Sequence, residues 1–107
     1  MTQVRFLTDE NQLTGFEIGG HSGFALEGSD IVCSAVSSAA LMAANTVTEI
    51  IKDKARVRES DGYLYFEVEA PSDSSISLLE GLKLHLTQIS EQYPQNIKII
   101  YGGKQNA

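Results

Sequence analysis

The chain has 107 residues, enough for one domain with its own core and too few for two. Hydrophobic residues make up 42% and charged residues 21%, which is typical of a globular domain. Eight basic against fourteen acidic residues give a net charge of −6, and the basic residues form no cluster. Because nucleic-acid affinity depends largely on Lys and Arg neutralising phosphates, we expect no direct nucleic-acid binding; a basic partner fits the charge better.

Cysteine content and hydropathy indicate a compartment. A single cysteine, Cys33, rules out a disulfide within the chain and is typical of the reducing cytoplasm. Segment 1–10 contains Arg5, Asp9 and Glu10 and lacks the apolar run of a signal peptide. The longest uncharged stretch, 31–48, is interrupted by Ser, Thr and Asn, which makes it too polar for a membrane span. We therefore expect a cytoplasmic protein without a membrane segment, in which 31–48 is a helix buried on most sides.

The first part of the chain predicts a β-hairpin. Short runs rich in Val, Phe, Leu and Ile occupy 3–7 and 13–18, and the polar stretch 8–12 separates them. That pattern is typical of two strands joined by a turn. Glycines at 19, 20, 23 and 28 mark the following segment as a loop.

A long helix is predicted from Ile31 onward. Apolar residues recur there every three or four positions, which is the period of one helix face. Ser29 or Asp30 suits the N-cap, and Lys52 and Lys54 suit the negative end of the helix dipole. The buried face is expected to contain Val32, Val36, Ala39, Ala43, Val47 and Ile50.

The second half predicts a hairpin, a helix and a last strand. Strands at 55–59 and 63–69 flank the tight turn 60–62. Pro71 interrupts the chain before a helix that Ser72, Asp73 or Ser74 can cap, and Pro94 ends that helix. A strand at 97–101 and a disordered tail at 102–107 complete the chain.

Alternation and helical spacing assign the faces of these elements. In the strand at 63–69 we expect Leu64, Phe66 and Val68 to face the core, and Tyr63, Tyr65 and Glu67 to face outward. The second helix is expected to bury Leu79, Leu82, Leu86, Ile89 and Tyr93. The order β-β-α-β-β-α-β predicts an α+β fold, with two helices packed on a mixed, mostly antiparallel five-stranded sheet, as one domain over 1–107.

The segment richest in chemical groups is 20–35, where a histidine and the cysteine flank a glycine-containing loop. A thiol reacts as its thiolate, which a helix N-terminus and an imidazole partner both favour. Cys33 is expected in the first turn of the long helix, and His21 stands twelve residues earlier. Together they would form a Cys-His dyad for acyl transfer. The same residues also fit a small core cysteine and a loop histidine without a function, and their spacing leaves both interpretations open.

Neighbouring polar residues have two interpretations each. Asp30 either caps the helix or orients His21, and Ser37, one turn beyond Cys33, either packs the helix or donates a hydrogen bond within a pocket. His85 stands between two leucines and is interpreted as structural. One Cys and two His are too few for a zinc site, so we expect no metal, and no motif indicates another cofactor.

The residues Gly20-His21 and Asp30-Ile31-Val32-Cys33-Ser34-Ala35-Val36-Ser37 resemble the ribosomal-processing cysteine proteases called Prp. The similarity extends to the length, the element order and the Tyr93-Pro94 pair before the last strand. It implies that His21 is the general base and Cys33 the nucleophile, with Gly20, Asp30 and Ser37 in supporting roles.

The resemblance also implies a substrate and an assembly. Members of this family are cytoplasmic, tend to form homodimers and remove a short N-terminal extension from one large-subunit ribosomal protein, number twenty-seven. The cut follows a hydrophobic sequence that contains Phe and is needed for ribosome assembly. Phe24 and Leu26 would then offer apolar surface to an aromatic side chain of the substrate, or simply pack the loop.

Two other functions fit the residues. One is a non-catalytic, ribosome-associated protein-binding module in which Cys33 is structural and the uncharged long helix is a dimer or partner surface. The other is a hydrolase or acyl transferase that uses the same dyad on a small thioester. Neither alternative requires a cofactor.

Overall fold

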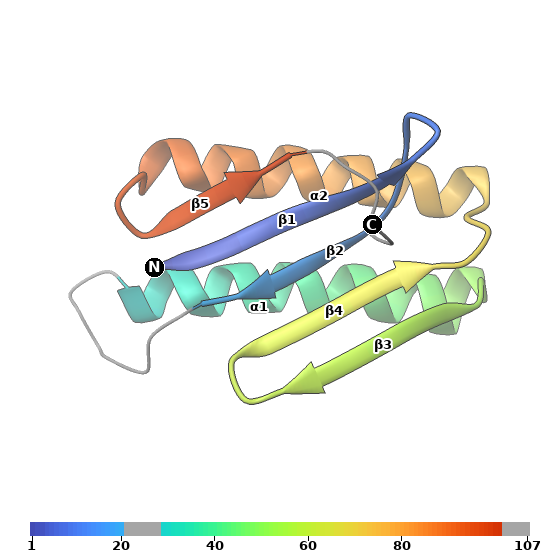
Figure 1. Cartoon of the computed structure of the whole chain (residues 1–107), viewed down its shortest axis with the longest axis horizontal. Coiled ribbons are helices and arrows are strands. Elements are labelled where there is room, and N and C mark those ends of the chain that lie inside the picture. Colours follow the sequence, from blue (N-terminus) through green and yellow to red (C-terminus); the bar gives the residue numbers. More distant parts are fainter. Residues whose placement is uncertain (21–28, 102–107) are drawn as a thin grey trace.

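The computed structural model describes residues 1–20 and 29–101, and for Ser29 and Asp30 the backbone alone. Its strands form one mixed sheet in the order β3-β4-β2-β1-β5, in which β1 and β5 run parallel and the other neighbours antiparallel. The strands are β1 Thr2–Asp9, β2 Gln12–Gly19, β3 Ala55–Ser60, β4 Tyr63–Val68 and β5 Ile97–Ile100. The α-helices α1 Ser29–Asn45 and α2 Asp73–Gln92 cover one face of this sheet (Figure 1). The predicted α+β fold is confirmed.

The core lies between the sheet and the two helices. Phe6, Phe16 and Phe66 stand opposite one another on β1, β2 and β4, and the rings of Phe16 and Phe66 stack with centroids 5.4 Å apart. Helix α1 covers them with a fully buried stripe made of Val32, Val36, Ala40 and Ala43, which Val47 of the following helical segment extends. Burial of these apolar side chains is the main stabilising contribution to a domain of this size.

Helix α1 buries one face and not most of its surface, so that expectation is wrong. Ile31, Leu41 and Met42 lie exposed, and Ile50, predicted as a core residue, is 74% exposed. The cause is a change of helix type. After Asn45 the chain continues as the π-helix η1 (Thr46–Ile51), in which Lys52 N–H donates to Val47 O at 2.7 Å. The wider turn moves Ile51 instead of Ile50 onto the core.

Ala39 also differs from the prediction, whereas Lys52 lies near the end of the helix, as predicted. Lys52 directly follows the last helical residue with a left-handed backbone, φ 69°, and is the C-cap. Ala39 is half-buried, while its neighbour Ala40 holds the core position. The segment Ile31–Ile51 is long and apolar enough to cross a membrane, by length and composition only. Its Val and Ala stripe instead packs against the sheet.

Helix α2 begins as predicted and ends one residue early. Ser72 is its N-cap and accepts a hydrogen bond from Ser75 N–H. Asp53, in the connection after η1, accepts hydrogen bonds from Ser72 N–H and from the hydroxyls of Ser72 and Ser75, at 2.9, 2.8 and 2.6 Å. These bonds lower the pKa of the Asp53 carboxyl below its usual value. Tyr93 lies beyond the helix end and is exposed, so its predicted place in the buried stripe is wrong.

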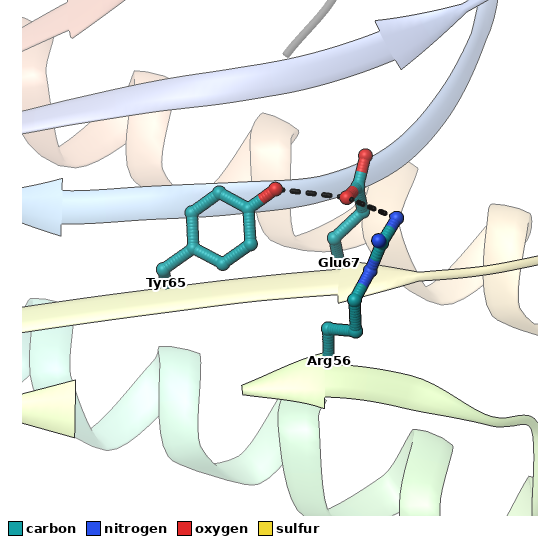
Figure 2. Close-up of polar contacts among 3 residues, drawn as sticks. All are labelled: Arg56, Tyr65 and Glu67. Carbon is teal, nitrogen blue, oxygen red and sulfur yellow. Dashed lines mark hydrogen bonds and ion pairs between the residues drawn. The ribbon is translucent and has the colours of Figure 1, made fainter. Parts of the chain in front are cut away.

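The face of the sheet opposite the helices carries charged residues and one buried tyrosine. Tyr65 faces outward from the helices, as expected, yet it is only 2% exposed. The Arg58 guanidinium lies over the Tyr65 ring, 4.7 Å from its centroid. The Tyr65 hydroxyl donates to Glu67, which Arg56 also binds (Figure 2). Burial, with the bond to Glu67, raises the pKa of Tyr65 to about 12.

Candidate functional site

Cys33 lies at the start of α1, at the end of the helix nearest the N-terminus of the chain (Figure 1). Cys33 was predicted in the first turn of the helix. Because the helix begins at Ser29, Cys33 instead opens the second turn. A helical side chain tilts toward the helix N-terminus, so the sulfur remains close to the unpaired N–H groups of the first turn. Cys33 is half-buried.

Thr2, the first residue of β1, contacts the cysteine directly. Its Oγ1 lies 3.2 Å from Cys33 Sγ, a hydrogen bond in which either atom can donate. Thr2 belongs to the same sheet face as Val4 and Phe6, the face that the helices cover, and it is buried. Thr2 was not predicted as a site residue, although the alternation of Thr2, Val4 and Phe6 indicates that it faces the helices.

Gly20 lies on the other side of the same strand end. It follows β2, whose Gly19 pairs with Gln3 of β1. Gly20 has φ +76°, and a Cβ added to it would stand 3.3 Å from the carbonyl oxygen of Met1. The first two residues of the chain therefore separate Gly20 from Cys33, with Met1 beside the glycine and Thr2 on the sulfur. Two predicted site residues, Gly20 and Cys33, therefore lie at the same end of β1, one beside Met1 and the other beside Thr2.

The other predicted site residues have different outcomes. His21, Phe24 and Leu26 lie outside the described residues. Asp30 lies in the first turn of α1, because the helix begins at Ser29; its prediction as the N-cap is wrong, and its side chain is not among those described. The helix start was predicted too late because Ser29 and Asp30 are polar and do not belong to the apolar period that located the helix.

Ser37 lies one turn beyond Cys33, is exposed and lines a cavity of about 160 Å³ between α1 and the β3–β4 hairpin. The apolar walls of this cavity are Ile18, Ala40, Leu41 and Leu64, and Tyr63 closes one side. A second cavity, of about 260 Å³, lies on the helix-free face and has Gly20, Glu17 and Tyr63 in its walls. The Tyr63 hydroxyl donates to Glu17, and this bond raises the pKa of Tyr63. The tyrosine thus borders both cavities.

The described residues contain no metal-binding group, and the second histidine lies apart from Cys33. Within residues 1–20 and 29–101, no group of three or more His, Cys, Asp or Glu side chains could hold a metal ion. His85 is exposed on α2 and lines a different cavity, between α1 and α2.

Comparisons with known proteins agree with the fold and show the family of the chain. A family profile described as cysteine protease Prp matches residues 1–98. The ribosomal processing cysteine protease Prp of Bacillus subtilis is 30% identical over 94 residues, which are 81% of this chain and 84% of that protein. The protein of the same name from Staphylococcus aureus is 24% identical over 98 residues, or 89% and 92% of the two chains.

Solved structures show the same fold. The crystal structure of an essential ribosomal processing protease Prp from S. aureus, in complex with a substrate peptide, matches with a TM-score of 0.86 at 23% identity. The match covers 95% of this chain and 100% of that one. A structure of the S. aureus protease with a covalently linked product peptide matches with a TM-score of 0.82 at 24% identity, with the same coverage.

Proposed function

Because the chain belongs to the cysteine protease Prp family, we propose that it is an endopeptidase in which Cys33 is the nucleophile and His21 the general base. The observation that carries the proposal is the approach of Gly20 and Cys33 to the same strand end. His21 follows Gly20 directly in the sequence, and consecutive Cα atoms are about 3.8 Å apart.

The reaction proposed for this site has two steps. The Cys33 thiolate attacks the scissile carbonyl, the peptide C–N bond breaks, and His21 transfers the thiol proton to the leaving amine. Water, deprotonated by His21, then hydrolyses the acyl-enzyme and releases the new carboxyl terminus. Backbone N–H groups at the start of α1 are suited to stabilise the oxyanion, because the helix leaves them unpaired.

We propose that Gly20, Asp30 and Ser37 have supporting roles. Phe24 and Leu26 are proposed to contact the substrate. Gly20 lets the backbone pass Met1 on the way to His21. Asp30 orients the imidazole, and Ser37 binds the substrate at the mouth of the 160 Å³ cavity. The apolar walls of that cavity suit a hydrophobic side chain of the substrate.

The proposed substrate is the N-terminal extension of a large-subunit ribosomal protein, number twenty-seven, in the cytoplasm. The relatives that carry the name ribosomal processing protease support this choice. A net charge of −6 favours encounter with a basic ribosomal protein.

Incubation with the extended ribosomal protein, followed by mass spectrometry of the products, tests the function. We expect one cut that releases the extension, no cut with Cys33→Ala or His21→Ala, and full activity with His85→Ala, whose histidine lies exposed on α2. Full activity in Cys33→Ala would contradict the proposal.

Alkylation by iodoacetamide separates the protease from the binding module. We expect Cys33 to alkylate rapidly at mildly acidic pH and more slowly after His21→Ala. An ordinary slow thiol, together with intact precursor, would favour a non-catalytic binding protein.

We further propose a homodimer formed through α1. Its outer face exposes Ile31, Leu41 and Met42, and Ile50 of η1 extends this apolar surface. In a protein of net charge −6, Asp30 is the one charged residue of α1, so two copies can approach along this helix with little repulsion.

A further inference from the structure

We propose that Thr2 is a positioning residue for the nucleophile: its hydroxyl holds the Cys33 sulfur in place and donates a hydrogen bond to the thiolate. This inference rests on the proposed function and adds a third residue to the dyad. The contact that carries it is the 3.2 Å hydrogen bond between Thr2 Oγ1 and Cys33 Sγ.

Thr2 is a rigid partner for the sulfur. It is 3% exposed, and its backbone N–H donates to Asn96 O at 2.9 Å. It also pairs with Ile97 of β5, so the strand end that carries it is held from the side. A β-branched side chain has a restricted χ1, which fixes the hydroxyl further. The sulfur, in contrast, belongs to a half-buried side chain near a helix end.

The hydroxyl can serve both protonation states of the sulfur. A threonine hydroxyl accepts a hydrogen bond from a thiol and, after rotation about its C–O bond, donates one to a thiolate. A bond to an ionised partner is roughly twice as strong as one between neutral groups. Thr2 therefore favours the thiolate, and it keeps the sulfur beside the first residue of β1.

Thr2→Val tests this role because it removes the hydroxyl and keeps the shape of the side chain. We expect the pH of half-maximal iodoacetamide alkylation to rise by about one unit, which corresponds to an alkylation rate about tenfold lower below that pH. With the extended ribosomal protein, kcat should fall by a similar factor while KM stays unchanged. Thr2→Ser keeps the hydroxyl and should restore both readouts. The protein is used without an N-terminal tag, since Thr2 is the second residue.

Thr14→Val is the matched control. Thr14 is also a buried threonine of the sheet, on β2, and its hydroxyl has no hydrogen-bond partner among the described residues. Its replacement should leave the alkylation profile and kcat unchanged. If Thr2→Val keeps the wild-type pH profile, or if Thr2→Ser loses as much as Thr2→Val, the role of the hydroxyl is contradicted.

The two proposals fail in different ways. Alkylation needs no peptide, so a wild-type protein that alkylates rapidly but cuts no precursor contradicts the proteolytic function alone. An unshifted alkylation profile in Thr2→Val, in an enzyme that cuts its precursor, contradicts the role of Thr2 alone.

Discussion

Gly20 has a conformation and a neighbour that both oppose a side chain. Its φ of +76° is left-handed, which costs other residues about 1–2 kcal/mol. The Met1 carbonyl oxygen, 3.3 Å from the position of a Cβ, adds a contact tighter than usual. Relief of either strain would move the backbone just before His21. The effect of a substitution should therefore be larger on catalysis than on stability.

Gly20→Ala is expected to lower the free energy of unfolding by about 1–2 kcal/mol and to reduce precursor cleavage by more than that loss of folded protein explains. Urea unfolding and initial cleavage rates measure the two effects. Gly81→Ala is the control: Gly81 lies on α2 with nothing within 4 Å of an added Cβ, so this change should stabilise the helix by up to about 1 kcal/mol. Equal cleavage rates for Gly20→Ala and wild type would show that the backbone at Gly20 does not position the site.

At the scale of the elements, regular periodicity was predictable and the departures from it were not. The caps and breakers around α2 located that helix, and the strand alternation located Phe66 and Val68 in the core. The π-helix η1 has no signal in apolar spacing, so Ile50 was assigned to the wrong face. Alternation gave the side of the sheet on which Tyr65 lies but not its burial; here Arg58 lies over the ring.

Only those residues of the candidate site that stand out locally were predictable from the sequence. Cys33 and Gly20 stand out locally, as the one cysteine and as a glycine that ends a strand. Thr2 becomes part of the site only through the pairing of β1 with its neighbours and the packing of α1 on the sheet. The alternation of Thr2, Val4 and Phe6 indicates only that Thr2 faces the helices, whereas its contact with Cys33, 31 residues away, is a property of the topology.

Asp53 joins the end of η1 to the start of α2, and its charge makes that junction pH-dependent. The three hydrogen bonds lower its pKa below the usual 3.8, so the folded state favours the carboxylate. The stabilisation is present above pH 3.8 and is lost as the pH falls through the lower pKa of the folded state. At pH 6, Asp53→Asn should therefore unfold at a lower urea concentration than the wild type. Between pH 6 and pH 2.5, its urea midpoint should fall by less than that of the wild type.

The comparison for this prediction is Glu80→Gln, which removes an exposed carboxylate from α2. Its urea midpoint should follow that of the wild type at both pH values. If Asp53→Asn loses as much stability as the wild type between pH 6 and pH 2.5, the carboxylate at this junction is not a source of the acid sensitivity.

At the scale of the whole molecule, α1 and η1 connect the candidate site with the junction between η1 and α2. The end that carries Cys33 lies beside the chain N-terminus and the end of β2, while η1 at the far end leads to Asp53 and the start of α2 (Figure 1). The inner face of α1 holds the core. Beyond Asp30, α1 has no charged residue, and its outer face leaves the large apolar side chains of Ile31, Leu41 and Met42 exposed. A second copy that covered this face would fix α1, and with it the position of the nucleophile.

Met42→Glu tests the dimer because Met42 is 57% exposed in the last turn of α1. Two copies related by a two-fold axis would place two new carboxylates in the same apolar interface, so we expect a dimer in the wild type and a monomer in the variant. Light scattering coupled to size-exclusion chromatography gives the mass directly. Gln95→Glu adds the same charge at an exposed position between α2 and β5 and should remain dimeric. A wild type that elutes as a monomer at high micromolar concentration, or a Met42→Glu variant that stays dimeric, would rule out this face as the interface.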